Sequence, residues 1–337
     1  MKTALRFFWP VAAVFLVVSV SSIKAGTLGE LFTAATASNQ DYSVFTLDLE
    51  LAQLKKTKGE IEAKVELDRV NASYTFTSAL ANYRRSVLSF YNEVIDAVFA
   101  AAAAELDLES VSLSLQNAKV DKDYADTRYR NGLISEEVFK EIDIAFKTTS
   151  NAQELSAWTL KDAKDTVLLV TGLAWNTSLL PELPAFEAVV RLEDWTARDT
   201  SLQLALLSEK IAALKTASMP TNASAYDKRI QETENLKTKA LVANAESEAK
   251  RAYESAFSTL KNQANLLQIR KDEYALKEAS YKDALLKYER GIISLGDKNI
   301  KEISVLNARK NLLAAQKSYI KSIGSYLSGT GANPLGL

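Results

Sequence analysis

A seven-residue period runs through the second half of the sequence and limits its fold more than any other feature. Six aromatic or aliphatic residues follow one another at this spacing: Tyr253, Leu260, Leu267, Tyr274, Tyr281 and Tyr288. Such a period keeps one stripe on one side of an under-wound α-helix that packs lengthwise on another helix. In the alternative, an ordinary amphipathic helix of a bundle, the stripe would drift over five heptads. The period therefore predicts an extended coiled coil.

The first half carries the same stripe 159 residues earlier. The equivalent positions are Val94, Ala101, Leu108, Leu115, Lys122 and Tyr129, of which only Lys122 is charged. Helices over 79–130 and 226–290 would be about 78 Å and roughly 100 Å long at a rise of about 1.5 Å per residue. Because these lengths exceed the diameter of a compact domain of this size, we expect a rod or a part of a larger assembly.

The same short motif ends both long helices. It reads YRNGLIS at 129–135 and YERGIIS at 288–294. Gly132 and Gly291 can adopt the left-handed conformation that often ends a helix. Ser135 and Ser294 stand where an N-cap of the following helix belongs. By its local chemistry alone, the motif predicts a helix–turn–helix joint.

The two halves follow one plan. Each begins with an amphipathic helix (28–69 and 192–217), reaches a polar break with Asn-Ala-Ser (70–78 and 221–228), and continues into the long helix, the turn and a return helix. Such duplication indicates an internal structural repeat. The predicted organisation is a signal peptide (1–25), a first helical repeat (26–173), a linker (174–190), a second helical repeat (191–331) and a C-terminal tail (332–337).

The N-terminus has the features of a secretory signal peptide. Lys2 and Arg6 precede an apolar run at 7–22, and a small-residue cleavage site follows at Ala25. A membrane anchor that is not cleaved is the alternative, but the apolar run is short and contains Pro10. The sequence therefore predicts a protein that works outside the cytoplasm.

The composition argues against several classes of function. Histidine and cysteine are both absent, which excludes disulfides, thiolate nucleophiles, histidine bases and ordinary zinc sites. The 41 basic and 42 acidic residues nearly cancel, so no nucleic-acid-binding face is indicated. Glu136 and Glu137 could form an acid pair, but neighbouring residues on a helix point apart. We predict no catalytic residues, no cofactor and no metal site.

The duplicated motif, with a long heptad helix before it and a shorter helix after it, resembles the TolC family of outer-membrane efflux proteins. The matching segments are YRNGLISEEVFKEIDIAF, YERGIISLGDKNIKEISVLNARKNLLAAQKSYIKSIGSYL and VLLVTGLAWNTSLLPELP. The similarity covers most of residues 28–331. It implies an all-α fold of long antiparallel coiled-coil hairpins in two tandem repeats. Three such chains would form a hollow helical tube, each chain being one protomer of an α-barrel.

The resemblance also implies a functional site at the two turns. In the family these turns lie at the far tip of the tube and meet the hairpin of a periplasmic adaptor protein, which works with an inner-membrane pump. The residues carried over are Tyr129, Asn131, Gly132, Leu133, Ser135, Tyr288, Arg290, Gly291, Ile292 and Ser294. Asp297 stands where family members often place an acid that narrows the closed tip. It could equally be an acid favoured at the start of a helix.

One part of the family pattern is missing from the sequence. Family members place a β-hairpin between the first two helices of each half, and one spanning hairpin needs about 20 residues. The breaks here are shorter, and only SYTFTS at 73–78 alternates like half a strand. We therefore expect a reduced or absent β-barrel, with a separate outer-membrane anchor as a candidate partner.

The expected function is that of a passive conduit component of an envelope-spanning efflux or export system. Such a protein would act as a homotrimer in the outer membrane, or in the periplasm attached to it. The alternative is a periplasmic coiled-coil scaffold that conducts nothing.

Overall fold

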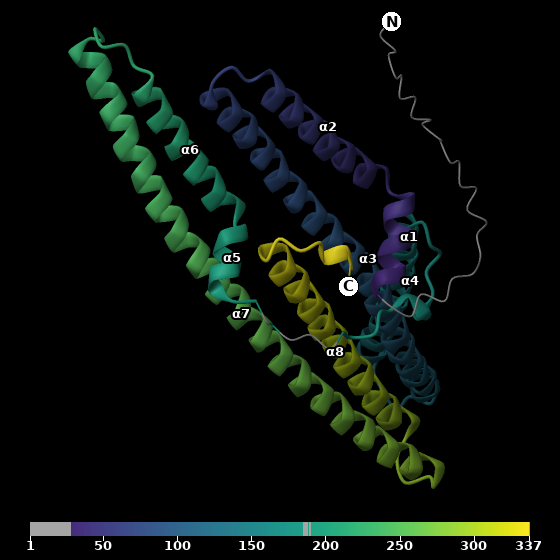
Figure 1. Cartoon of the computed structure of the whole chain (residues 1–337). Coiled ribbons are helices and arrows are strands. Elements are labelled where there is room, and N and C mark those ends of the chain that lie inside the picture. The colour runs from purple at the N-terminus through teal and green to yellow at the C-terminus, as the bar shows by residue number, and fades with distance from the viewer. Residues whose placement is uncertain (1–27, 185–187, 189, 337) are drawn as a thin grey trace, which may run out of the picture.

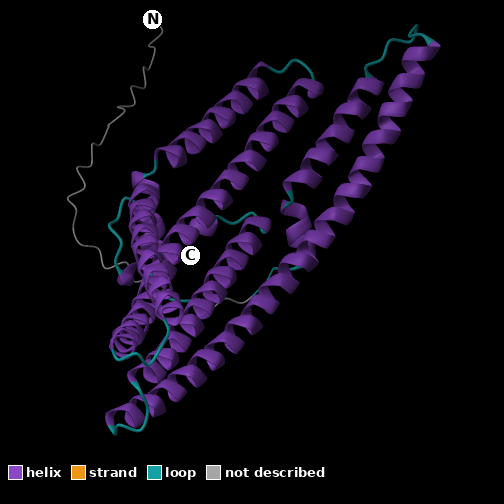
Figure 2. Cartoon of the chain, turned by 180° about the vertical axis from the view of Figure 1, so that it is seen from behind, coloured by secondary structure: helices purple, strands orange, loops and turns teal. Residues whose placement is uncertain are grey.

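The computed structural model describes residues 28–184, 188 and 190–336, and the secondary structure of these residues is helical throughout (Figure 2). Its elements are α1 (Leu28–Ser38), α2 (Gln40–Glu62), α3 (Glu66–Arg130), α4 (Glu136–Thr171), the 3₁₀ turn η1 (Thr177–Leu179), α5 (Leu192–Arg198), α6 (Thr200–Ala217), α7 (Ala225–Glu289), α8 (Leu295–Gly329) and the 3₁₀ turn η2 (Pro334–Gly336). No strand occurs in this part of the chain. The predicted all-α fold is confirmed, whereas the predicted signal peptide at 1–25 lies outside the described residues.

The tandem repeat is visible in the lengths of the helices. α3 and α7 have 65 residues each, and a shift of 159 residues takes Glu66 to Ala225 and Arg130 to Glu289. α4 and α8 have 36 and 35 residues. Each half therefore contains one very long helix of about 98 Å. In each half a shorter helix packs against each end of it.

The helices form an open row in which α3 is central (Figure 1). α3 packs against α4 and α8 toward one end of the molecule, and against α2 and α6 toward the other. α7 packs against α8 and α6. The two turns at 129–135 and 288–294, which we call the tip turns, lie at one end of the row. The order of the helices is α4–α3–α8–α7 at this end and α2–α3–α6–α7 at the opposite end. α2, α4 and α7 are the edges of the row.

The main hydrophobic core lies where the middle of α3 meets α1, α4 and α8. Tyr91 of α3 is completely buried, stacks on Phe32 of α1 with ring centroids 4.8 Å apart, and donates its hydroxyl to the Ile320 carbonyl at 2.8 Å. Burial raises the pKa of the Tyr91 hydroxyl. Ala101 and Ala102 are also buried, and small side chains at these positions let the neighbouring helices approach closely. This core joins the two repeats through α3 and α8.

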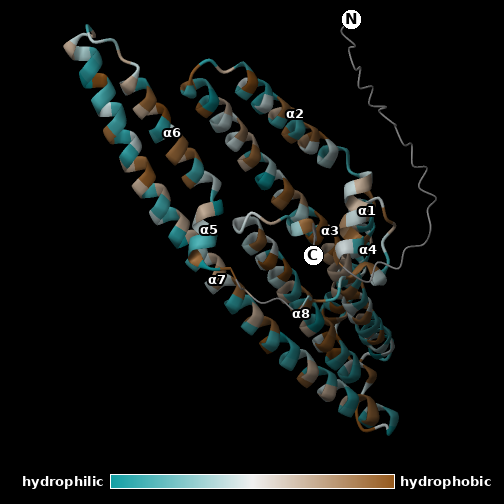
Figure 3. Cartoon of the chain, in the orientation of Figure 1, coloured by the Kyte–Doolittle hydropathy of each residue, from teal (hydrophilic) through white to brown (hydrophobic). Residues whose placement is uncertain are grey.

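A second cluster forms around α5, α7 and α8. Trp195 of α5 packs with Leu260 and Leu267 of α7 and with Tyr319 and Ile323 of α8. Leu260 and Leu267 belong to the predicted heptad stripe, which therefore faces α8. The hydropathy of the residues shows where the apolar faces of these helices lie (Figure 3).

Among the described residues, α3 alone meets the length and composition expected of a membrane-spanning helix. The apolar window concerned is 61% buried inside the chain. This burial is typical of a core helix, and it agrees with the position of α3 at the centre of the row.

The predicted break at 70–78 is wrong, because these residues lie inside α3. The chain turns at 63–65 instead, and SYTFTS is helical. A Cβ added to Gly59 of α2 would lie 3.0 Å from the Cβ of Ala72. The small residues at 71–73 thus form a close helix–helix contact. In the second half, by contrast, Ser224 caps the start of α7.

The predicted first helices, 28–69 and 192–217, are not continuous. The first comprises α1, α2 and the start of α3, and the second comprises α5 and α6. The Asn39 side chain accepts a hydrogen bond from the Tyr42 N–H at 3.0 Å at the start of α2. The Asp199 carboxylate accepts one from the Leu202 N–H at 2.7 Å at the start of α6. Both residues are N-caps, which satisfy backbone donors that a helix start leaves free.

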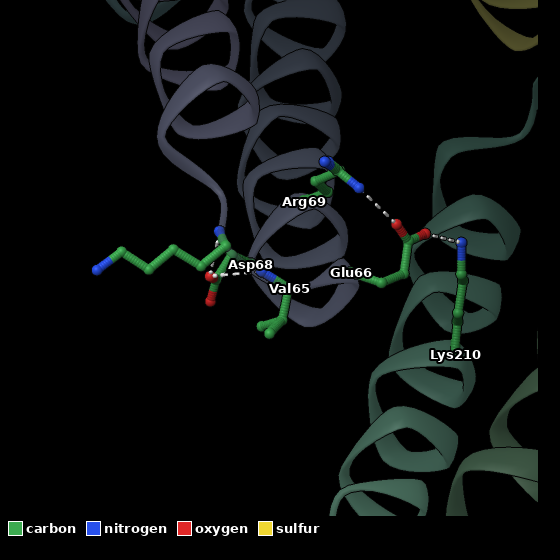
Figure 4. A network of polar contacts seen from close by, with 6 residues as sticks. Val65, Glu66, Asp68, Arg69 and Lys210 are labelled. Atoms are coloured by element: carbon green, nitrogen blue, oxygen red, sulfur yellow. Dashed lines mark hydrogen bonds and ion pairs between the residues drawn. The ribbon is translucent and has the colours of Figure 1, made fainter.

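The three-residue turn between α2 and α3 is held by acidic side chains (Figure 4). The Asp68 carboxylate accepts hydrogen bonds from the backbone N–H groups of Lys64 (3.2 Å) and Val65 (3.4 Å). Glu66 pairs with Lys210 of α6 at 2.8 Å, and the hydrogen bond from Lys210 lowers the pKa of the Glu66 carboxyl. This exposed pair stabilises the fold little, but it shows that the start of α3 lies beside α6.

Candidate functional site

The two tip turns have the same backbone geometry. Gly132 and Gly291 have φ angles of 69° and 70°. The Gly132 N–H donates to the Tyr129 carbonyl at 2.9 Å, and the Leu133 N–H donates to the Arg128 carbonyl at 2.9 Å. The second turn repeats both bonds, again at 2.9 Å: Gly291 to Tyr288 and Ile292 to Lys287. This arrangement is a Schellman motif, which satisfies the last carbonyls of a helix and requires a left-handed residue.

The turns also present equivalent side chains to solvent. Leu133 and Ile292 are each 64% exposed, although both are large and apolar. Asn131 and Arg290 beside them are also exposed. Both turns lie at the lower end of the molecule in Figure 1. One chain thus offers the same small apolar surface twice, at one end and with different polar neighbours.

The return helices begin at the predicted caps. The Ser135 hydroxyl accepts a hydrogen bond from the Val138 N–H at 3.3 Å, and the Ser294 hydroxyl accepts one from the Asp297 N–H at 3.1 Å. In the second turn the Asp297 carboxylate also accepts from the Ser294 N–H (3.2 Å) and the Ser294 hydroxyl (2.7 Å). These two residues form a capping box.

The capping box bears on the two predicted roles of Asp297. The hydrogen bonds from the Ser294 side chain and backbone lower the pKa of the Asp297 carboxyl. The structure therefore places Asp297 as a helix-start residue. Because its side chain remains exposed, a role in narrowing a closed tip is compatible with this position and stays a prediction.

The first tip has an apolar groove that sequence reasoning missed. Tyr129 stacks on Phe139 of α4, with ring centroids 5.0 Å apart. Next to this pair lies a groove of about 320 Å³ between α3 and α4. Its lining residues include Tyr124, Arg128, Ile134, Val138, Ile142 and Phe146. The helical spacing of Val138, Ile142 and Phe146 is the signal that could have indicated it.

The second tip is more polar at the equivalent place. Lys298 stands 159 residues after Phe139 and forms an ion pair with Glu302 at 2.7 Å. The hydrogen bond to Glu302 raises the pKa of the Lys298 ammonium. The two tips therefore share their turn geometry but differ in the surface behind it.

A buried amide joins the two repeats close to the tips. Asn299 of α8 is completely buried, and its Nδ2 donates to Gln116 Oε1 at 2.9 Å and to Asn117 Oδ1 at 2.8 Å, both on α3. A buried polar contact of this kind is stable only in one register. Asn299 therefore fixes how α8 lies along α3. Its role could not be recognised without knowing which helices are neighbours.

Ion pairs support the same contact farther from the tips. Asp107 of α3 pairs with Lys310 of α8 at 2.6 Å, and Asp96 pairs with Lys321 at 2.7 Å and with Lys317 at 3.3 Å. Partial burial would raise the pKa of Asp96, but its hydrogen bonds to the two lysines lower it. Acidic side chains on α3 thus meet basic side chains on α8.

The edge helices expose large apolar side chains. On α4, Leu155 and Trp158 are 65% and 69% exposed. On the opposite edge, Ile269 of α7 is 52% exposed. Trp158 follows Gly132 by 26 residues and Ile269 precedes Gly291 by 22, so each position lies at a comparable distance from the turn of its own hairpin. Within the described residues no cluster of carboxylates has the arrangement of a metal site.

Known structures share this architecture. The outer membrane channel CmeC of Campylobacter jejuni matches 92% of this chain with 86% of its own, at 12% identity and a TM-score of 0.57. The outer-membrane channel OprN matches 91% with 90% of its own, at 13% identity and a TM-score of 0.57. The open state of the MtrE outer membrane channel of Neisseria gonorrhoeae matches 94% with 93% of its own, at 12% identity and a TM-score of 0.56.

At this level of identity the likeness concerns the fold. No protein-family model matches the sequence, and no match to a curated protein was found. These three structural neighbours are outer membrane channels with the TolC-like fold. The chain therefore has the TolC-like fold, built from two tandem helical hairpins and without a strand in its described residues.

Proposed function

We propose that the chain is a passive conduit component of an envelope-spanning efflux or export system. The observation that carries this proposal is the pair of tip turns, which present the same exposed apolar residue, Leu133 or Ile292, on the same Schellman geometry at one end of the molecule. The likeness of the fold to outer membrane channels supports the proposal. Channel function needs an enclosed path and no catalytic residue.

The tip turns would dock a periplasmic adaptor protein. Exposed apolar residues such as Leu133 and Ile292 gain free energy when a partner covers them. Asn131 and Arg290 would surround them with polar contacts, as at the rim of many interfaces. In this role Gly132 and Gly291 shape the turn, and the partner contacts the residues beside them.

Photo-crosslinking in cells tests the docking role. A photo-reactive side chain introduced at Asn131 or Arg290 should form crosslinks to an adaptor protein, because both positions lie beside the exposed apolar residue of their turn. The same side chain placed at Leu169, which is 81% exposed near the end of α4 away from the tips, is the control. Equal crosslinking from all three positions, or none from the tips, would contradict the proposal.

The edges of the row would join copies of the chain into a tube. We expect α4 of one copy to pack against α7 of the next, so that three copies close into a ring of hairpins. Leu155 and Trp158 would then meet apolar residues around Ile269 at the same height. This contact would cover side chains that are more than half exposed in the single chain.

Substitutions at these edges test the assembly. Trp158→Asp or Ile269→Asp should convert a trimer into monomers, because each places a charge in the apolar contact and repeats it in every interface of the ring. The molecular mass in solution, measured by light scattering after gel filtration, shows the change. Leu133→Asp, which also replaces an exposed apolar residue, should leave the trimer intact. A trimeric Trp158→Asp variant would exclude α4 as an interface.

Export itself separates a conduit from a scaffold. A conduit is needed for the passage of substrate, whereas a non-conducting scaffold of the same fold would dock partners without it. The variant with Leu133→Asp and Ile292→Asp cannot separate a conduit from a scaffold. Its loss of docking would stop the efflux of a fluorescent substrate whether the chain conducts substrate or only holds its partners. The deciding experiment places engineered cysteines inside the proposed trimer and modifies them with a thiol reagent. If the chain is a conduit, this modification obstructs the path and efflux stops.

A further inference from the structure

The α6–α7 hairpin end projects beyond the other described helices, at the end opposite the tip turns (Figures 1 and 2). Lys210 of α6 pairs with Glu66, the first residue of α3, and α6 continues for seven residues to Ala217. Seven helical residues span about 10 Å. The end formed by residues 215–230, which we call the projecting end, therefore lies about two helical turns beyond the start of α3.

The projecting end carries exposed apolar side chains. Tyr226 and Ile230 lie one turn apart on the same face of α7 and are 85% and 59% exposed. They border a shallow hollow together with Arg229, Thr233 and Glu234. If copies of the chain pack side by side at one height, the α2–α3 turn of a neighbour ends about two turns lower. A neighbouring copy therefore leaves Tyr226 and Ile230 uncovered.

The charges at this end are mainly positive. Residues 215–230 contain Lys215, Lys228 and Arg229, with Asp227 as their only acid. The Asp227 carboxylate accepts a hydrogen bond from the Ser224 hydroxyl at 2.7 Å at the start of α7. Acidic residues follow one turn lower, where Glu232 pairs with Arg229 at 3.2 Å. The outermost part thus presents an apolar pair with an excess of basic residues, while Glu234 borders the side of the hollow that lies farther along α7.

We propose that the projecting end binds the surface of an anionic lipid bilayer. Tyr226 and Ile230 would enter the boundary between headgroups and acyl chains, where tyrosine is favoured because its ring is apolar and its hydroxyl is polar. Lys215 and Lys228 would lie next to lipid phosphates, and each basic residue adds to the attraction of an anionic surface. The protein would rest on the membrane at this end, with its tip turns pointing away from it.

The small size of the projecting end favours lipid over a protein partner. A stable protein interface uses roughly 20–30 residues on each side and demands matching shapes. The projecting end consists of a single hairpin turn and its flanking helical turns. A lipid surface needs no shape match, and several projecting ends in one assembly would bind it together. The inference does not depend on adaptor docking.

Flotation with lipid vesicles tests the proposal. The probes are vesicles of phosphatidylethanolamine with phosphatidylglycerol, and neutral vesicles of phosphatidylcholine. The protein is purified after export, and its mass shows whether residues 1–25 have been removed. We expect binding to the anionic vesicles that weakens as salt is raised. Tyr226→Asp with Ile230→Asp should lower the bound fraction about tenfold or more.

The first of these substitutions should not disturb folding. Position 226 is the second residue of α7, where an acidic residue interacts favourably with the helix dipole. The matched control is Leu133→Asp with Ile292→Asp, which makes the same kind of change at the other end. It should keep vesicle binding and lose adaptor crosslinking, whereas the variant at 226 and 230 should do the reverse.

Three results would overturn the proposal. The first is that the protein does not bind anionic vesicles. The second is that both double variants lose vesicle binding to the same extent. The third is that the protein stays in native outer membranes but has no affinity for lipid vesicles. The last would show that a membrane protein covers the projecting end. Failure of the proposed function has a different signature, because adaptor crosslinking would be absent while vesicle binding remained.

Discussion

A chain carrying both Gly132→Pro and Gly291→Pro should no longer form adaptor crosslinks from positions 131 and 290. Both glycines have positive φ angles near 70°, whereas proline is restricted to about −65°. Proline also lacks the N–H that donates to Tyr129 or Tyr288 in the present turns. Each turn must therefore change its path, and Leu133 and Ile292 would point in new directions.

The helix content should remain nearly the same in this variant. The turns lie between 65-residue helices and their return helices, so the change is confined to a few residues at one end of the molecule. Circular dichroism at 222 nm measures this content, and gel filtration shows whether the oligomeric state is that of the unchanged chain. Adaptor crosslinking at the level of the unchanged chain would contradict the docking role of the turns.

Alanine at the same two positions is the matched control. No atom lies within 4 Å of a Cβ added to Gly132 or Gly291, so alanine causes no clash. Its cost is that of a left-handed residue, about 1–2 kcal/mol in each turn, and the N–H donors are kept. We expect weaker crosslinking than in the unchanged chain and clearly more than in the proline variant. A similar loss of adaptor crosslinking in the alanine and proline variants would show that the partner contacts the glycines directly.

The features that could be predicted from the sequence are local or periodic. The heptad stripe depends only on spacing along one helix. It predicted that Leu260 and Leu267 pack on another helix, and the structure shows that this helix is α8. The two turns could be predicted from their own residues, because Gly132 and Gly291 adopt the left-handed conformation that favours glycine. The repeat preserves both ends of α3 and α7, but the predicted match of the two Asn-Ala-Ser segments does not follow this shift and placed the first break wrongly.

The features that could not be predicted depend on contacts between distant segments. The turn at 63–65 contains neither glycine nor proline, and Asp68 holds it by accepting hydrogen bonds from backbone N–H groups. The sequence Asn-Ala-Ser at 71–73 is typical of a turn, but here it is helical and Ala72 packs beside Gly59 of another helix. Likewise, the burial of Asn299 follows from the position of α3 next to α8, which one sequence does not reveal.

That contact between α3 and α8 also predicts a large effect on stability, at Gly324. A Cβ added to this residue would lie 2.3 Å from Cε1 and 2.7 Å from Cδ1 of Tyr91. Tyr91 has no free space, because it stacks on Phe32 and donates its hydroxyl to the Ile320 carbonyl. Gly324→Val should therefore force α8 away from α3 and lower the free energy of unfolding by about 3 kcal/mol or more.

Helix propensity alone predicts that Gly324→Val raises the free energy of unfolding, whereas the clash predicts that it lowers it. The measurement therefore decides between the two effects. Valine is favoured over glycine inside a helix by a few tenths of a kcal/mol, so without the clash the variant would be slightly more stable. Gly296→Val on the same helix is the matched control, since its added Cβ has an ordinary contact of 3.6 Å with the Ser294 hydroxyl. Thermal unfolding should show a midpoint lowered by roughly 5–10 °C for the first variant only.

Removing the obstacle tests the cause of the destabilisation. If the clash with Tyr91 is responsible, Gly324→Val should cost less in a chain that already carries Tyr91→Ala, because the added methyl groups would fill part of the space left by the ring. The two changes are then coupled, and the double variant is more stable than the sum of the single effects predicts. Additive effects would show that Gly324 is required for another reason. Coupling would show that the close Tyr91–Gly324 contact helps to hold the two hairpins of one chain together, beside the Asn299 contact and the ion pairs of α3 and α8.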